Sequence, residues 1–340
     1  MELKRKIESE FLPFVAKATR FLGNEIHSVQ KDPGEGTLRL VLGYAGSYDS
    51  GIIHPEYDAL YSLWNGEKSV WAERIYAYSP SDEEVSREHG VPAFSLESKT
   101  PVNQFPLIIF YLPNVLSILE VLTILDLSSI SHYRSERNQT HSLIVGCGPG
   151  ITAAECLTDF FDILLPGDAI TGNCRLWQFL KTRDWKLPEK ESLFHELLSI
   201  PGVYLPGLYK EEYSSYGELL VIKPNSASVP TRIEMFPEEE LERMTVNIAP
   251  LVPLGSVNSR NYFPGDWRLG SESESVKPLH RLQPISSPSL ASFFRDTLKI
   301  LRMAGSMGVD QLISFNQVVL ANSWLYFKKH SLLGGKTIRL

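Results

Sequence analysis

Short apolar runs alternate with amphipathic stretches across the first half of the chain. The runs at 38–42, 70–76, 107–112, 142–145 and 162–165 have the length of buried strands. The run 107–112 (LIIFYL) is apolar on both faces, which is typical of a central strand in a parallel sheet covered by helices. Strands and helices thus alternate about five times between 37 and 185. This alternation predicts an α/β fold with a Rossmann-like, doubly wound parallel sheet.

The hydrophobic pattern is different on either side of this region. Residues 3–22 have helical spacing and predict an amphipathic lead-in helix. Beyond 185 the pattern predicts a charged helix over 186–200, a strand over 218–223, a Pro-, Ser- and Gly-rich connection over 250–289, a helix over 290–303 and a strand over 309–315. We therefore expect three regions: a lead-in over 1–36, the sheet domain over 37–185, and a third region over 186–340.

One apolar stretch has about the length of a membrane span, 106–125. Pro113 and Asn114 interrupt it, and Glu120 places a charge in its second half. A buried strand, a turn and an apolar helix fit these residues better than a span. The first ten residues are charged and no apolar signal region follows them, so we expect a cytoplasmic protein without a membrane partner.

Composition narrows the class of protein further. The chain has 340 residues, with 33 Lys+Arg against 40 Asp+Glu and a net charge of −7, which argues against a nucleic-acid partner. A hydrophobic content of 43% is enough for a packed core and excludes wholesale disorder. The 3 cysteines cannot all pair, so a disulfide scaffold is excluded and a reducing compartment is favoured.

Glycine-rich loops follow three of the predicted strands, at 43–51, 146–150 and 166–168. In open α/β sheets ligands bind at the carboxyl ends of the strands, near the point where the strand order reverses. Backbone N–H groups in such loops hold phosphate or a nucleotide-like tail. None of the loops matches a dinucleotide or P-loop motif, and glycines also occur in strand–helix turns for steric reasons alone. The pattern therefore leaves ligand binding and plain turn geometry both open.

Two residue types near these loops are candidates for chemistry. His54 is a candidate metal or cobalt ligand, but a surface or helix N-cap histidine is the favoured interpretation. Cys147 lies in a glycine loop, where we expect an accessible thiol, and Cys156 lies on a predicted helix, where we expect a packed one. The carboxylates Asp162, Asp168, Glu97 and Asp159 suit acid–base chemistry, although nothing in the sequence places any two of them together.

An ordered set of short motifs resembles a known family. Those motifs are Arg20–Glu25, Ser28–Asp32, Ser47–Gly51, Leu60-Tyr61, Trp71–Tyr76, Pro92–Ser98, Gly146–Pro149, Asp159–Asp162, Gly167-Asp168 and Ile200–Pro206. Together they cover about 190 residues in one collinear order. The set resembles the N-terminal, cobalamin-binding-like region of bacterial radical-SAM proteins that carry a B12-binding domain. The resemblance implies a corrinoid-type Rossmann-like domain followed by a radical-SAM barrel.

The sequence departs from that family pattern at both expected cofactors. The barrel should bring C-x-x-x-C-x-x-C, whose three thiolates bind a [4Fe–4S] cluster, but no cysteine follows Cys174. The region 261–273 occupies the expected place and contains none, so the resemblance implies a truncated, degenerate barrel remnant without a cluster. The cobalamin signature D-x-H-x-x-G is also missing, because Asp49 and His54 are too far apart to form it.

The resemblance also implies a candidate corrinoid site without a histidine ligand to cobalt. The cofactor-binding candidates are Ser47, Tyr48, Asp49, Gly51, His54, Gly146, Cys147, Gly148, Gly167 and Asp168. No metal site and no catalytic residue is predicted.

Three functional hypotheses follow. The first is a degenerate radical-SAM relative that acts as a ligand-binding or regulatory module, with cobalamin as its candidate ligand. The second is a corrinoid-dependent transferase that works without an iron–sulfur cluster. The third is a partner subunit that docks a complete radical-SAM enzyme, or a homo-oligomer, through its C-terminal region. In that region strand 309–315 needs a cover from 320–335 or from another chain.

Overall fold

The structure is a computed structural model that describes residues 2–34, 36–138, 142–183, 189–216 and 219–237. These residues belong to one compact unit, Met1–Leu251. The expected helix and strand at 290–303 and 309–315, and the cover at 320–335, lie outside the described residues.

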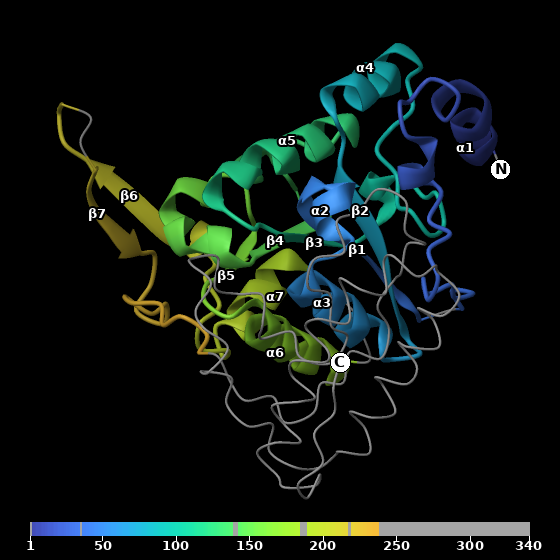
Figure 1. Ribbon diagram of the computed structural model, residues 1–340. Coiled ribbons are helices and arrows are strands. Elements are labelled where there is room, and N and C mark those ends of the chain that lie inside the picture. Colours follow the sequence, from blue (N-terminus) through green and yellow to red (C-terminus); the bar gives the residue numbers. More distant parts are fainter. Residues whose placement is uncertain (1, 35, 139–141, 184–188, 217–218, 238–340) are drawn as a thin grey trace, which may run out of the picture. The chain divides into compact units, whose positions relative to one another are not determined.

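Five parallel strands form the central sheet in the order β2-β1-β3-β4-β5 (Figure 1). They are β1 (Leu38–Ser47), β2 (Val70–Ala77), β3 (Leu107–Tyr111), β4 (Leu143–Cys147) and β5 (Ile163–Leu165). All four ladders are parallel, and the registers Leu40↔Leu107 and Leu107↔Leu143 align the central strands. The predicted α/β fold with a parallel sheet is confirmed, and each strand starts within one residue of its expected position.

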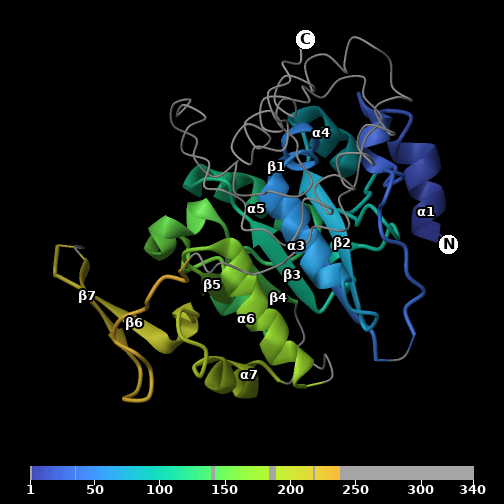
Figure 2. The same cartoon turned by 60° about the horizontal axis from the view of Figure 1, so that its bottom comes forward.

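Helices cover both faces of the sheet, as Figures 1 and 2 show. One face carries α4 (Pro80–Glu88) and α5 (Ile118–Leu127), and the other carries α3 (Pro55–Asn65), α6 (Ala169–Lys181) and α7 (Lys190–Leu197). The short helix α2 (Tyr48–Gly51) directly follows β1. Each strand is buried on both sides, which explains the continuous apolar runs. The segment 106–125 forms β3, a turn and α5, and no helix in the described ranges has the length and apolar character needed to cross a membrane.

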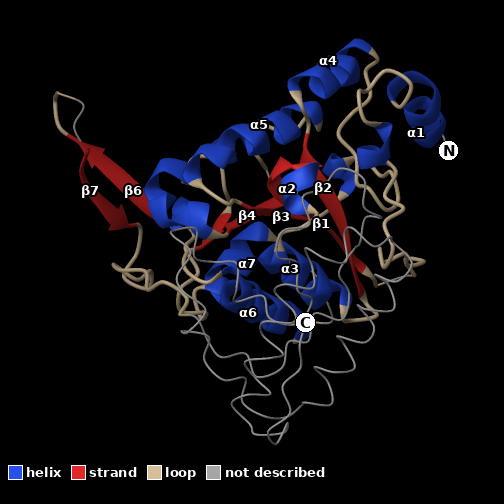
Figure 3. Cartoon of the chain, viewed as in Figure 1, coloured by secondary structure: helices blue, strands red, loops and turns tan. Residues whose placement is uncertain are grey.

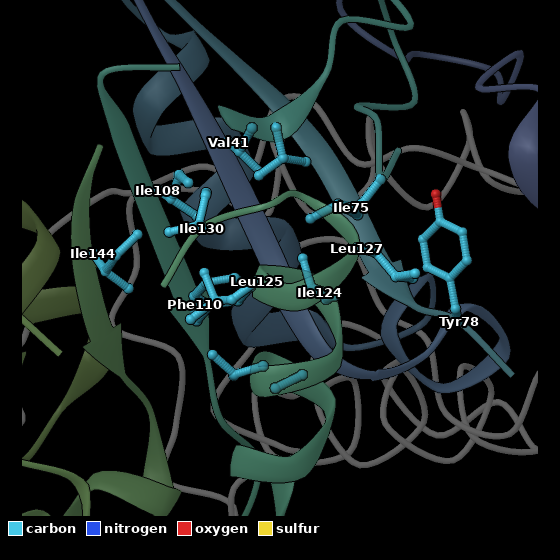
Figure 4. Close-up of a cluster of buried hydrophobic side chains, with 14 of the residues drawn as sticks. Val41, Ile75, Tyr78, Ile108, Phe110, Ile124, Leu125, Leu127, Ile130 and Ile144 are labelled. Carbon is cyan, nitrogen blue, oxygen red and sulfur yellow. The ribbon is translucent and has the colours of Figure 1, made fainter. Parts of the chain in front are cut away.

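The main hydrophobic cluster lies between the sheet and α5 (Figure 4). Val41, Ile108 and Ile144 project from three neighbouring strands toward Ile124 and Leu125 of the helix. Side chains alternate along a strand, so Leu40, Leu42 and Ile109 pack on the opposite face, beneath α3 and α6. Burial continues past residue 185, the sequence-based boundary, through Val203, Tyr204 and Leu205, and the Leu164–Tyr204 bridge ties this segment to β5.

The lead-in segment differs from the predicted helix over 3–22. It forms α1 (Glu2–Lys6), a π-helical turn at Ile7–Phe11 and a short 3-10 turn at Ala18–Phe21. Pro13 has no backbone N–H to continue a helix, and this accounts for the break. Ile7, Phe11 and Phe21 are still buried, and Phe11 packs edge-on against Phe21 and Phe94.

A two-stranded antiparallel ribbon extends from the sheet domain (Figure 3). It consists of β6 (Tyr209–Tyr213) and β7 (Leu219–Pro224). The second strand confirms the prediction over 218–223. The first has the charged sequence YKEEY without an apolar run, so its strand was missed.

Candidate functional site

In open α/β sheets, ligands bind at the carboxyl ends of the strands. The chain runs from β1 to β2 on one side and then crosses back to β3 on the other. The strand order therefore reverses between β1 and β3, and this switch point is where doubly wound sheets hold their ligands.

Side chains of the chain itself fill the switch point. Tyr44 at the end of β1 stacks on Tyr111 at the end of β3, with ring centroids 5.8 Å apart and an interplanar angle of 12°. His54 packs against both rings, at 4.9 Å from Tyr111 and 5.4 Å from Tyr44. Tyr57 and Tyr76 lie within 5.4 and 6.3 Å of Tyr44. We call Tyr44, Tyr57, Tyr76 and Tyr111 the tyrosine cluster.

The glycines beside this cluster make room for its rings. A Cβ at Gly46 would lie 2.7 Å from the Tyr44 ring, and one at Gly51 would lie 2.5 Å from the Tyr76 ring. Because β1 continues to Ser47, Gly43 and Gly46 lie inside the strand rather than in the expected loop. The glycine pattern at this edge thus reflects close packing of tyrosine rings against the backbone.

His54 is the N-cap of α3. Its Nδ1 accepts a hydrogen bond from the Tyr57 N–H at 3.5 Å, which confirms the N-cap interpretation. Desolvation between the tyrosine rings lowers the pKa of His54 to about 4, so the imidazole is neutral at pH 7.

The 146–150 loop folds against the end of β3. Gly148 has a φ of 99° and lies against the Leu112 carbonyl, and the N–H of Gly150 donates to that carbonyl at 2.9 Å. A Cβ at Gly146, within β4, would lie 2.9 Å from Leu164. The close packing here is again with the protein's own groups.

The expected exposures of two cysteines are reversed. Cys147 is fully buried at the end of β4, its Sγ–H donates to the Phe110 carbonyl at 3.5 Å, and desolvation raises the pKa of its thiol to about 12. Cys156, on a 3-10 segment (Pro149–Leu157), is exposed. The prediction was wrong because β4 runs to Cys147 and places its side chain inside the sheet rather than in a loop.

The third glycine loop is covered by a returning segment. Gly167 has a φ of 101° and pairs with Phe236 in an isolated bridge. The Asp168 N–H donates to the Phe236 carbonyl at 2.9 Å, while the Asp168 carboxylate accepts from the Thr171 N–H at 2.7 Å as the N-cap of α6.

The three other residues predicted to bind a cofactor are Ser47, Tyr48 and Asp49, and they lie at the end of β1 that faces β2. Ser47 is the N-cap of α2, and Asp49 pairs with Arg20 and, at 3.6 Å, with Lys17. The Tyr48 hydroxyl donates to Glu25 at 2.7 Å. Ser47 and Tyr48 also line a cavity that the sequence did not predict.

The cavity has a volume of about 160 Å³ and lies at the carboxyl ends of β1 and β2. Its apolar wall contains five aromatic side chains: Phe21, Tyr48, Tyr76, Tyr78 and Phe94. Ala77, the last residue of β2, also lines it.

Three charged side chains of the cavity wall have polar atoms without a hydrogen bond. These atoms are Arg20 Nε, Asp82 Oδ1 and Glu120 Oε2, and each is buried. The Tyr76 and Tyr78 hydroxyls also lack a well-formed hydrogen bond, although Arg74 and the Phe94 backbone lie near them. A buried donor or acceptor left without a partner costs about 1–3 kcal/mol, so a water molecule or ligand that pairs with these atoms would stabilise the fold.

A buried ion network adjoins the cavity. Arg74 is 0% exposed, and its guanidinium donates to Glu25 and to Glu97, each at 2.7 Å. Burial raises the pKa of Glu97, while for Glu25 burial is outweighed by Arg74 and the Tyr48 hydrogen bond, so its pKa is lowered. Tyr48 thus connects the network to the cavity wall.

The sequence analysis above mentions two residues of the cavity wall, but it does not place them together. Glu120 is the charge that interrupts the apolar stretch 106–125, and Arg20 opens the first family motif. Of the four carboxylates considered for acid–base chemistry, three take structural roles: Glu97 pairs with Arg74, Asp162 accepts from the Ile144 N–H at 2.9 Å, and Asp168 caps α6. The fourth, Asp159, is exposed.

The match to a known family covers the centre of the domain. The family described as "Radical SAM proteins, N-terminal" matches residues 57–206.

Residues 57–206 resemble the N-terminal region of radical SAM proteins.

The matched residues run from α3 through β2, β3, β4 and β5 to the segment after α7, and cover less than half of the 340 residues. No curated protein and no solved structure gives a significant match.

The sequence motifs above imply two cofactors, a corrinoid and an iron–sulfur cluster. A corrinoid tail at the switch point would have to displace the stacked Tyr44 and Tyr111 rings, so the edge as folded does not fit that group. Within the described part of the chain, which contains all three cysteines, no three His, Cys, Asp or Glu side chains gather closely enough to hold a metal ion.

Proposed function

We propose that this chain is a small-ligand-binding or regulatory module that uses a radical-SAM N-terminal scaffold without generating radicals. The observation that carries the proposal is the cavity beside β1 and β2, with Arg20, Asp82 and Glu120 atoms left unpaired in its wall. One fold can carry different functions at different sites, so a radical-SAM N-terminal scaffold is compatible with a binding role.

A thermal-shift screen of small polar molecules on the full chain tests the proposal. We expect hits that raise the Tm with ligand concentration, because a molecule that binds only the native state stabilises it. Ala77→Met is the matched variant, since a longer side chain at the end of β2 fills the cavity without altering a charge. Hits that bind Ala77→Met as well as the wild type would show that the site lies elsewhere.

The cysteines are the reason why we expect the chain not to generate radicals. All 3 precede residue 175, and C-x-x-x-C-x-x-C does not occur in the sequence. Anaerobic reconstitution with iron and sulfide, followed by absorption spectroscopy, checks it. We expect no stoichiometric cluster, and a [4Fe–4S] spectrum from the chain alone would overturn this part.

Two of the hypotheses involve a corrinoid: a corrinoid-binding module and a corrinoid-dependent transferase without a cluster. A separate experiment tests both. Equilibrium titration with hydroxocobalamin should give no saturable binding at high micromolar concentration, because Tyr44 and Tyr111 fill the switch point. Saturable binding that is strengthened by Tyr44→Ala would support the corrinoid site and show that the tyrosine cluster opens.

A further inference from the structure

The wall of the β1–β2 cavity has a definite chemical preference. Building on the proposed function, we propose that the cavity takes a small organic ammonium compound, with its cation between the carboxylates of Asp82 and Glu120 and a hydrogen-bond acceptor toward Arg20.

The first carboxylate comes from the start of α4. Asp82 is only 3% exposed, and its Oδ2 accepts a hydrogen bond from the Ser79 hydroxyl at 2.6 Å. Its Oδ1 has no partner. Ser79 thus holds one oxygen of this carboxylate in place, and the other oxygen can still accept a hydrogen bond.

The second carboxylate comes from the first turn of α5. Glu120 Oε2 is buried, lines the same cavity and has no hydrogen bond. The two helices are neighbours on one face of the sheet (Figure 1). Asp82 and Glu120 therefore line one cavity from two separate helices, and a ligand with several N–H donors could pair with both carboxylates.

The charge balance of the wall favours a cation. Among the described residues of the cavity wall, Arg20 carries the one guanidinium, and its charge is already paired with Asp49 outside the wall. The Asp82 and Glu120 charges have no cation paired with them in the wall, so a phosphate or carboxylate alone would meet net repulsion. The Nε–H of Arg20 remains as a donor, and it calls for one acceptor atom on the ligand.

The aromatic wall adds to the same preference. The rings of Phe21, Tyr48, Tyr76, Tyr78 and Phe94 surround the space. Aromatic faces attract ammonium groups, and their apolar surface suits the carbon skeleton of an amine. A cavity of about 160 Å³ is close to the size that holds benzene, so the ligand has roughly six heavy atoms.

Ethanolamine is the probe, because it joins an ammonium group to a hydroxyl acceptor within this size. Ethylene glycol is the neutral counterpart and glycolate the anionic one. Isothermal titration of the full chain in phosphate buffer, which contains no competing amine, should give saturable binding of ethanolamine alone. We expect Glu120→Gln to weaken that binding at least tenfold, since it replaces a charge-assisted hydrogen bond with a neutral one. Glu84→Gln, the same change at an exposed position of α4, should leave it unchanged.

Saturation-transfer NMR on the wild type compares the binding of ethanolamine, ethylene glycol and glycolate without any variant. This measurement therefore remains informative if Glu120→Gln does not fold. Binding of glycolate or ethylene glycol in preference to ethanolamine would overturn the ammonium inference and leave the binding module intact. Ethanolamine binding that Glu120→Gln does not weaken would overturn the placement of the cation. A cavity that holds water only, with no binding of any probe and no hit in the wider screen, would overturn both proposals.

Discussion

The rings of Tyr44 and Tyr111 lie nearly parallel across the boundary between β1 and β3, with their centroids 5.8 Å apart. This contact closes the switch point of the sheet. The unmet polar atoms lie instead on the other side of β1, in the cavity beside β2. The cavity of this α/β domain thus lies one strand away from the point where the strand order reverses.

Replacing Tyr44 by alanine should lower the free energy of unfolding substantially. Tyr44 is 4% exposed, and Tyr44→Ala removes a packed aromatic side chain from beside Tyr111, His54 and Tyr57. We expect the free energy of unfolding to fall by about 3–5 kcal/mol, measured by urea denaturation. Tyr216→Ala, at a position 91% exposed, should change it by less than about 0.5 kcal/mol. Equal effects from the two variants would mean that the rings do not pack as described.

The buried imidazole of His54 should make the protein acid-sensitive. Its pKa is about 4 in the folded chain against 6.5 when unperturbed, so unfolding takes up a proton between these values. Stability therefore falls as the pH drops from 6.5 to 4, by up to about 3 kcal/mol.

The variant His54→Asn isolates this contribution, because asparagine keeps the N-cap of α3 without a titrating ring. The difference in unfolding free energy between wild type and His54→Asn should depend on pH only below about 6.5. The same substitution at the exposed His195 of α7 is the control. A pH-independent difference at position 54 would contradict the buried, neutral histidine.

Removing the cation from the buried ion network should be costly. Arg74→Met leaves Glu25 and Glu97 without the guanidinium that contacts both. We expect a loss of about 3–5 kcal/mol at neutral pH. The loss should shrink toward pH 5, because two buried carboxylates without a cation take up a proton more readily.

Arg87→Met is the matched control for the network. Arg87 pairs with Glu83 of α4 and with Asp126 of α5 on the exposed surface, where ion pairs contribute little to stability, so we expect only a small loss. A similar small loss for Arg74→Met, independent of pH, would show that the network contributes little.

Thiol reactivity should distinguish the three cysteines. Cys156 is exposed, whereas Cys147 and Cys174 are buried, and the pKa of the Cys147 thiol is raised to about 12. Reaction with Ellman's reagent at pH 8 should modify one thiol quickly and the other two only after denaturation. Cys156→Ser should abolish the fast phase, and a fast phase in that variant would place another thiol at the surface.

Much of the scaffold was predictable because its signal is local. The runs 107–112 and 142–145 are apolar without alternation, and both form central strands of a parallel sheet, β3 and β4. Where the local signal was weak, as in the charged strand β6, the prediction failed.

The site was less predictable because it depends on contacts between distant residues. Nothing in the spacing of Tyr44 and Tyr111 indicates that their rings meet, since that follows from the β1–β3 register. The cavity joins Arg20, Asp82 and Glu120 from three separate segments. Cys147 was misplaced for the opposite reason, since a strand end that is one or two residues longer than expected turns a loop residue into a core residue.

A crystal structure of the full chain grown with ethanolamine, or with another hit from the screen, tests the central claim most directly. The account predicts ligand density in the cavity beside β1 and β2, in contact with Asp82 and Glu120, with the Tyr44–Tyr111 stack intact. Ligand density between β1 and β3, with those two rings displaced, would contradict it.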